Sequence, residues 1–305
     1  MSTLDDELNG ERVRMPRRTR TAAATRSRAS GRKAAGTILG GYLPLIVATL
    51  IVALPLIWMV LGSLKSPGEV VTRDLVIFPH HPTLDAYTQA NHEVDFARLF
   101  LNSTIVTVIG SAIKLLLALT TAYALVFVRF PFKQLIFPII LVALMVPAQV
   151  SIVPNYTLIA GLGGVNTYWG IILPGLGTAF GTFLLRQQFL ALPTEILEAA
   201  EVDGASHFSR LFRVVVPITT PTIATVALVT IVNEWNDYLW PLVITNSAHM
   251  MTLPVGLTLL HNSEGDVSSY PVLMAGAVVV IIPVLILFAF LQRYIVAGLT
   301  QGAVR

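Results

Sequence analysis

The sequence contains no cysteine, and charged side chains make up only 12% of its 305 residues. The lack of cysteine excludes disulfides, thiol chemistry and cysteine-ligated metal sites. Soluble domains carry about 25% charged residues. The low charge, together with 54% hydrophobic residues and a mean hydropathy of +0.73, therefore predicts a polytopic membrane protein.

Motifs for nucleotide binding and for catalysis are also missing. The closest approach to a G-x-x-x-x-G-K-[ST] loop, at residues 62–66, lacks the spacing of the first glycine, so we do not expect this chain to bind ATP by that route. No HExxH motif or nucleophile elbow occurs, and the adjacent His80 and His81 have no further ligand at metal spacing. We predict no enzyme activity and no metal or cofactor on this chain.

Six apolar runs are long enough to cross a bilayer, which takes about 20 helical residues. Small and hydroxylic residues in the second run suit close helix packing in lipid. Pro147 and Pro154 interrupt the third run and predict kinks. The predicted fold is an all-α polytopic membrane protein with six transmembrane helices, at residues 41–63, 102–128, 135–156, 167–186, 218–243 and 271–294.

Two predicted regions make up the chain. Residues 1–36 contain nine Lys or Arg and too few apolar residues for a core, so we expect a disordered basic tail. Residues 37–305 form the transmembrane domain. Sixteen Lys or Arg fall in the two termini and the 129–133 and 186–213 segments, and three fall in the connections on the opposite side. Because positive charge favours the cytoplasmic side, both termini are predicted to be cytoplasmic.

A polar stretch at 190–217 separates the fourth run from the fifth. Pro193 suits the first turn of a helix, which Gly204 ends in a left-handed conformation. Ser206 can cap a second short helix. Two basic residues are expected to close that second helix, Arg210 and Arg213.

The spacing within this stretch is also a family signature. Glu198-Ala199-Ala200, three residues, Gly204, nine residues and then Val214-x-Val216-Pro217 resembles the EAA loop of ABC importer permeases. The family usually has Ile and Leu where this chain has the two valines. Other segments resemble MalG-type carbohydrate permeases, namely MVPAQVSIVPNY, LRQQF, NEWNDYLWPL and QRYIVAGLTQGAV.

This resemblance covers roughly residues 40–305 and implies the type I ABC importer permease fold. It implies a second, MalF-type permease, a dimer of ATPase subunits that hold ATP and Mg²⁺, and an extracytoplasmic sugar-binding protein, all at the prokaryotic cytoplasmic membrane. No nucleic-acid partner is expected. It implies an ATPase contact at Gln301 and Gly302. It also implies a coupling role for Glu198, Ala199, Ala200, Asp203, Gly204 and Pro217.

The fifth run ends in a polar segment that contains Asn233, Glu234, Trp235 and Asp237. Glu234 and Asp237 are three residues apart and share one face of a helix. Ionisable groups within spans usually face a water-filled cavity, which favours a translocation path. A belt at the outer membrane interface, where tryptophan is common, is the competing interpretation. Lys114, inside the second run, can face the path, pair with Glu234, snorkel or become neutral.

The function predicted from these features is the permease subunit of an ATP-driven carbohydrate importer. One alternative is a permease for another class of solute. Another is a self-contained secondary transporter, which would need an internal repeat and an ion site at the midplane. The sequence has no convincing internal repeat.

Overall fold

The computed structural model describes residues 41–70, 76–260 and 269–301, and the structural statements below refer to these ranges. The chain divides into two units, residues 1–57 and 58–305. The basic tail predicted at 1–36 lies outside the described residues.

Three helices are each long and apolar enough to cross a membrane. They are α2 (Leu43–Ser63), α5 (Phe96–Phe127) and α16 (Tyr270–Gln301). The 32 residues of α5 span about 48 Å, which exceeds the hydrocarbon core of about 30 Å. At its start, the Asp95 carboxylate accepts the N–H of Arg98 at 3.1 Å and caps the helix.

Three more spans are bent pairs of helices. If each pair counts as one span the total is six, as the sequence predicts. The bends are 90°, 47° and 88° in chain order. In the first pair, α6 (Lys133–Met145) is followed by η2 (Ala148–Ser151) and α7 (Ile152–Gly161). In the second, α8 (Tyr168–Ile172) and η3 (Leu173–Leu176) are followed by α9 (Ala179–Leu190). In the third, α11 (His207–Arg210), η4 (Leu211–Val215) and α12 (Val216–Ile218) are followed by α13 (Thr220–Trp235) and α14 (Leu239–Ile244).

Two of the three bends, those of 90° and 88°, have identifiable chemical causes. Pro147 lies in the first break, as predicted, whereas Pro154 lies in the first turn of α7, where proline is tolerated, and not at the break. At the 88° bend, Pro221 has no N–H for the carbonyl of Pro217, and the Thr220 hydroxyl donates to that oxygen instead at 3.0 Å. Neither the third nor the fourth predicted run is one straight helix, because a bend divides each of them, whereas the 88° bend lies at the start of the fifth run.

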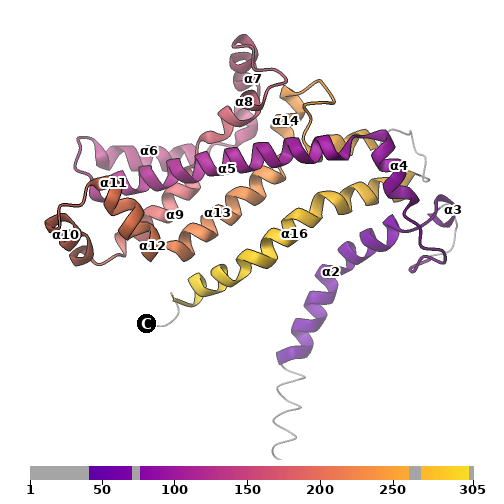
Figure 1. Ribbon diagram of the computed structural model, residues 1–305, viewed down its shortest axis with the longest axis horizontal. Helices are drawn as coiled ribbons and strands as arrows, with labels where there is room; N and C mark the ends of the chain where they lie inside the picture. The colour runs from indigo at the N-terminus through magenta and orange to yellow at the C-terminus, as the bar shows by residue number, and fades with distance from the viewer. Residues whose placement is uncertain (1–40, 71–75, 261–268, 302–305) are drawn as a thin grey trace, which may run out of the picture. The chain divides into compact units, whose positions relative to one another are not determined.

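The long helices pack through small residues. Figure 1 shows α5 lying along α9 and α13, and α13 also packs against α16. Ala118 and Ala122 of α5 are fully buried there. A Cβ on Gly181 of α9 would lie 3.1 Å from Val226 and 3.2 Å from Ala118, so the glycine sets how closely these helices approach. Such contacts stabilise helix pairs in lipid, where no hydrophobic force drives them together.

The connections predicted to face outward, at 64–101 and 245–270, contain short helices, and the second of them packs on the start of α5. The side chain of Asn102 is fully buried and donates to the carbonyls of His249 at 2.9 Å and Met251 at 2.8 Å. It also accepts the Tyr168 hydroxyl at 2.7 Å. Asn102 thereby fixes the chain after α14. The short elements are α3 (Pro67–Val70), α4 (Asp85–Glu93), α15 (Leu253–Leu257) and η5 (Thr258–Leu260).

Candidate functional site: an exposed loop and a polar cavity

The first half of the 190–217 loop has the predicted local structure. α10 (Thr194–Val202) ends at Gly204, whose φ is +77°. The N–H of Ala205 donates back to the carbonyl of Ala200 at 3.0 Å, which closes the helix end. Ser206 then caps α11 by accepting the N–H of Ser209 at 3.3 Å. The helix, glycine turn and capped second helix are therefore confirmed.

The second half of the loop differs from the prediction. The second helix does not close at Arg210 and Arg213, because α11 runs through the π-turn η4 into α12 without a break. Arg210 instead forms an ion pair with Glu201 at 2.7 Å. This ion pair joins the two loop helices, and the arginine side chain is only 11% exposed. The sequence interpretation treated Arg210 only as a helix-end charge and missed this partner.

The loop presents a partly apolar surface. Glu198, Ala199, Asp203, Gly204 and Pro217 are exposed, and Ala200 is half-buried. Large apolar side chains beside them are also exposed, including Val202 at 88% and Phe208 at 69%. Leu197, in contrast, is buried and anchors α10 to the helix core. An anchored loop with exposed apolar side chains is typical of a protein interface.

Two of the predicted path residues, Lys114 and Glu234, form an ion pair between α5 and α13. Lys114 donates to the Oε1 atom of Glu234, and the two side chains are 15% and 12% exposed. Pairing with Glu234 was one of the alternatives for Lys114. Two glycines make room for the pair. A Cβ on Gly110 would lie 2.7 Å from the Oε2 atom of Glu234, and one on Gly175 would lie 3.3 Å from the Lys114 ammonium.

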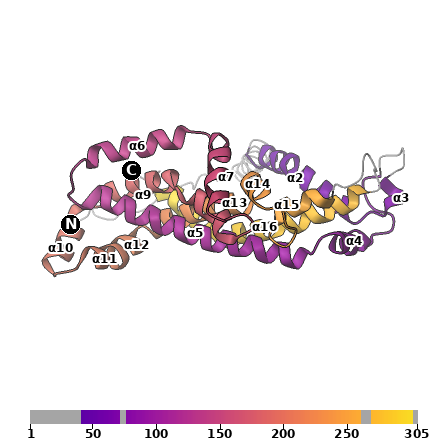
Figure 2. The same cartoon turned by 90° about the horizontal axis from the view of Figure 1, so that it is seen from above.

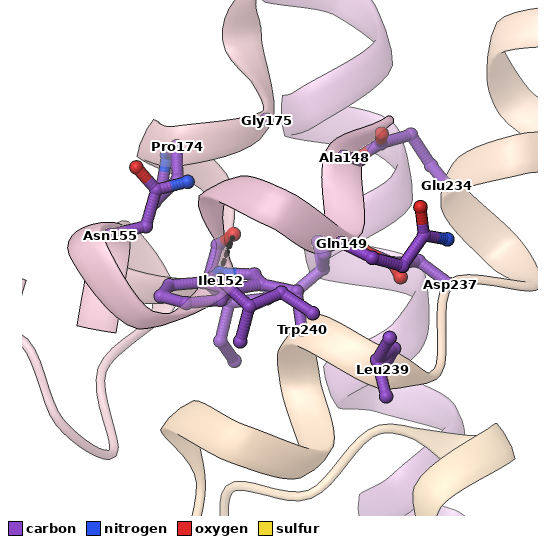
Figure 3. A pocket seen from close by; sticks show the side chains of 12 residues that line it. Ala148, Gln149, Ile152, Asn155, Pro174, Gly175, Glu234, Asp237, Leu239 and Trp240 are labelled. Carbon is purple, nitrogen blue, oxygen red and sulfur yellow. Dashed lines mark hydrogen bonds between the residues drawn. The ribbon is translucent and has the colours of Figure 1, made fainter. Parts of the chain in front are cut away.

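A cavity of about 180 Å³ lies on one side of this ion pair. Glu234 and Asp237 both line it, although Asp237 lies beyond the end of α13 (Figure 3). The Trp240 ring forms part of the wall, and its indole N–H donates to the carbonyl of Ile171 at 3.0 Å. Gln149 and Asn155 supply amide groups from η2 and α7 (Figure 3). The sequence interpretation did not single out these two amides, because only the bend before α7 brings them to the cavity.

A second cavity, of about 340 Å³, is lined by Lys114 and by Asn233 and Thr230 of α13. Ala148 of η2 lines both cavities. Figure 2 shows α7 turning away from the end of α6 after the bend between them. The two partners of the ion pair therefore line different polar cavities, Glu234 the first and Lys114 the second, and these cavities share one wall residue.

Trp235 belongs to a different environment. It is buried, and its indole N–H donates to the carbonyl of Val280 on α16 at 3.0 Å. Its ring makes a T-shaped contact with Phe100, with the two ring centroids 5.6 Å apart. It lines neither polar cavity. Trp235 therefore does not share the cavity that Glu234 and Asp237 line, which corrects the prediction that placed the three residues together. A residue next to Glu234 points to another side of the helix, because successive helical residues are about 100° apart.

The predicted ATPase contact at the C-terminus falls at the edge of the described residues. α16 continues as a helix to Gln301, so Gln301 is the last residue of this helix. Gly302 lies outside the described residues. The role of both residues stays a prediction.

Together, the broken spans, the exposed loop and the two polar cavities define a membrane protein that moves a solute. The family model described as "Binding-protein-dependent transport system inner membrane component" matches residues 114–301. The chain therefore belongs to this family. It is a multi-pass permease subunit of an ABC importer and not an enzyme.

Individual proteins resemble the chain over most of its length. It is 34% identical to the arabinooligosaccharides transport system permease protein AraQ of Halalkalibacterium halodurans, over 84% of this chain and 92% of the relative. It is 32% identical to the sn-glycerol-3-phosphate transport system permease protein UgpE of Brucella suis biovar 1, over 86% of this chain and 95% of the relative. The crystal structure of a bacterial ABC transporter involved in the import of the acidic polysaccharide alginate contains a similar chain, with a TM-score of 0.74 and 27% sequence identity. The match covers 86% of this chain and 98% of that chain.

Proposed function

We propose that this chain is one of two permease subunits of an ATP-driven carbohydrate importer and conducts the sugar along the two polar cavities. The observation that carries the proposal is the cavity lined by Glu234, Asp237, Gln149, Asn155 and Trp240 inside a permease of this family. Carboxylates and amides hydrogen-bond sugar hydroxyls, and an aromatic ring offers an apolar face. The named substrates of its relatives include an oligosaccharide, an acidic polysaccharide and a phosphate ester.

The 190–217 loop is proposed to dock on a cytoplasmic ATPase subunit. α10 has nine residues and extends about 14 Å, which suits a groove on a partner. The exposed side chains of Val202 and Phe208 would be buried by such a contact. ATP and Mg²⁺ would be held by the ATPase, and the C-terminal residues Gln301 and Gly302 would contact the same partner.

Further partners follow from this role. They are a MalF-type permease that completes the path and an extracytoplasmic sugar-binding protein that delivers the substrate. Purification of the chain from native membranes, followed by reconstitution with the recovered subunits, tests the proposal. We expect an ATPase and a second permease to co-purify, and the vesicles to take up sugar only with ATP and binding protein. Purification of the chain without an ATPase subunit would contradict it.

Both termini and the 190–217 loop are proposed to face the cytoplasm, on the basis of the charge distribution. The absence of cysteine makes this orientation testable with single cysteines at Ser206 and Ser247. A membrane-impermeant thiol reagent added to intact cells should label the cysteine at 247 and not the one at 206. Labelling of position 206 from outside would overturn the orientation.

A further inference from the structure

The charge balance of the two polar cavities bears on which carbohydrates can pass. Among the described residues, the charged side chains that line these cavities are Lys114, Glu234 and Asp237. The positive charge of Lys114 is matched by Glu234, to which it is bonded directly. Asp237 is then left over, and the cavity walls carry a formal charge of −1.

Lys114 cannot easily turn to another carboxylate or to a passing anion. Its side chain is 15% exposed and its ammonium group lies close to Gly175. On the other side, the Glu234 carboxylate fits against Gly110. An ammonium held in this way remains with its partner, because separating a largely buried ion pair leaves two uncompensated charges.

Asp237 has a different setting. It lies in the short connection between α13 and α14, it is exposed, and it lines the 180 Å³ cavity. In the described part of the chain it has no salt bridge; the two that occur join Lys114 to Glu234 and Arg210 to Glu201. Figure 3 shows its carboxylate among the side chains that line the cavity.

We propose that Asp237 is a specificity-determining residue that disfavours anionic solutes, so that the transported carbohydrate is uncharged and not a uronate or a phosphate ester. This inference rests on the proposed function and names its substrate class. Low-dielectric cavity walls that carry a net charge concentrate ions of the opposite sign and repel ions of the same sign. Uncharged hydroxyl groups escape that repulsion and can donate hydrogen bonds to the same carboxylate.

The cysteine-free sequence allows the cavity to be probed directly. Ala148 lines both cavities, so Ala148→Cys in the assembled complex places one thiol at the cavity wall. The probes are a cationic and an anionic methanethiosulfonate of similar size. Ala248→Cys, at an exposed alanine between α14 and α15, is the control. It gives the ratio of the cationic to the anionic reaction rate for a thiol outside the cavities. The complex with the unchanged chain gives the background from partner subunits.

We expect the cation-to-anion rate ratio at position 148 to exceed that at position 248 by about tenfold. Adding Asp237→Asn should bring the ratio at 148 to within about twofold of the control, because the remaining wall charges cancel. The matched change Asp85→Asn, at an exposed carboxylate at the start of α4, should leave the ratio unchanged. If the thiol at 148 reacts with neither reagent, Leu239→Cys on the wall of the same cavity replaces it.

Equal ratios at the cavity and control positions would overturn the inference, as would a cavity ratio that Asp237→Asn leaves unchanged. Because the labelling needs only an assembled complex, these results are independent of sugar uptake. Failure of the proposed function would appear instead as a chain without an ATPase partner or without ATP-dependent uptake.

Discussion

The 190–217 loop and the Lys114–Glu234 cluster are held together in opposite ways. In the loop, the ion pair between Glu201 and Arg210 joins residues that are only nine positions apart in the chain. In the cluster, Lys114 and Glu234 are 120 residues apart and lie on two different helices. Most loop side chains are exposed, whereas those of the cluster are largely buried. A loop side chain can therefore change at little cost in stability, whereas in the cluster function and packing depend on the same groups.

The largest expected effect is that of Lys114→Met, which leaves the Glu234 carboxylate largely buried without its partner. Removing one member of a buried ion pair costs about 3 kcal/mol or more. We expect a lower apparent melting temperature of the purified chain and a lower transport rate. The double variant Lys114→Met/Glu234→Gln should recover much of the stability, because no uncompensated charge remains. An unchanged melting temperature in the single variant would show that the pair contributes little.

Gly204→Pro should have its main effect on coupling. Gly204 has a φ of +77°, whereas proline is restricted to a φ near −65°, so α10 and α11 cannot keep their relative orientation. We expect normal abundance in the membrane but weak ATPase binding, or ATPase binding without coupled uptake. Co-purification and stimulated ATP hydrolysis measure the two outcomes.

Alanine at the same position sharpens this test. A Cβ at Gly204 meets nothing within 4 Å, so Gly204→Ala should cost only the left-handed conformation, about 1 kcal/mol. Gly161→Ala is the matched control, since its Cβ also meets nothing and its φ is not positive. Normal ATPase binding and uptake in Gly204→Pro would refute the coupling role of the loop.

The smallest effect is expected for Glu201→Gln. The Glu201 side chain is 69% exposed, and ion pairs of this kind contribute about 1 kcal/mol or less. We expect an unchanged melting temperature and a modest loss of ATPase stimulation, which should be greater at low salt. A fall in melting temperature comparable to that of Lys114→Met would remove the distinction between the two regions.

The sequence predicted the local features of the loop well, because they depend on residues close together in the chain. Gly204 ends the first helix through its own φ angle, and the Ser206 hydroxyl accepts a hydrogen bond from the N–H of a residue three positions later. The number of spans was predictable for a similar reason, since each is a stretch of about 20 mainly apolar residues. No feature of the nearby sequence shows that the Arg210 side chain pairs with Glu201, so we interpreted this arginine only as a charge at the end of a helix.

The cavity was predictable only in part. Ionisable residues inside spans indicate a polar path, which identified Lys114, Glu234 and Asp237. Gln149 and Asn155 could not be found in this way, because amides are not unusual near a span and their position depends on the 90° bend before α7. Trp235 was misplaced because neighbours in a sequence were expected to share a site, while a helix turns them to different sides.

The bend at Thr219 has a mechanical consequence. The segment from His207 to Ile218 is a continuous rod of helix, about 18 Å long, and it meets α13 at 88°. A push along this rod acts almost at right angles to α13 and applies a torque to it, with little force along its axis. Val215 and Val226 are buried in one core on either side of the bend, which resists flexing at the joint. Force on the loop would then rotate α13, together with Asn233 and Glu234 in its last turn.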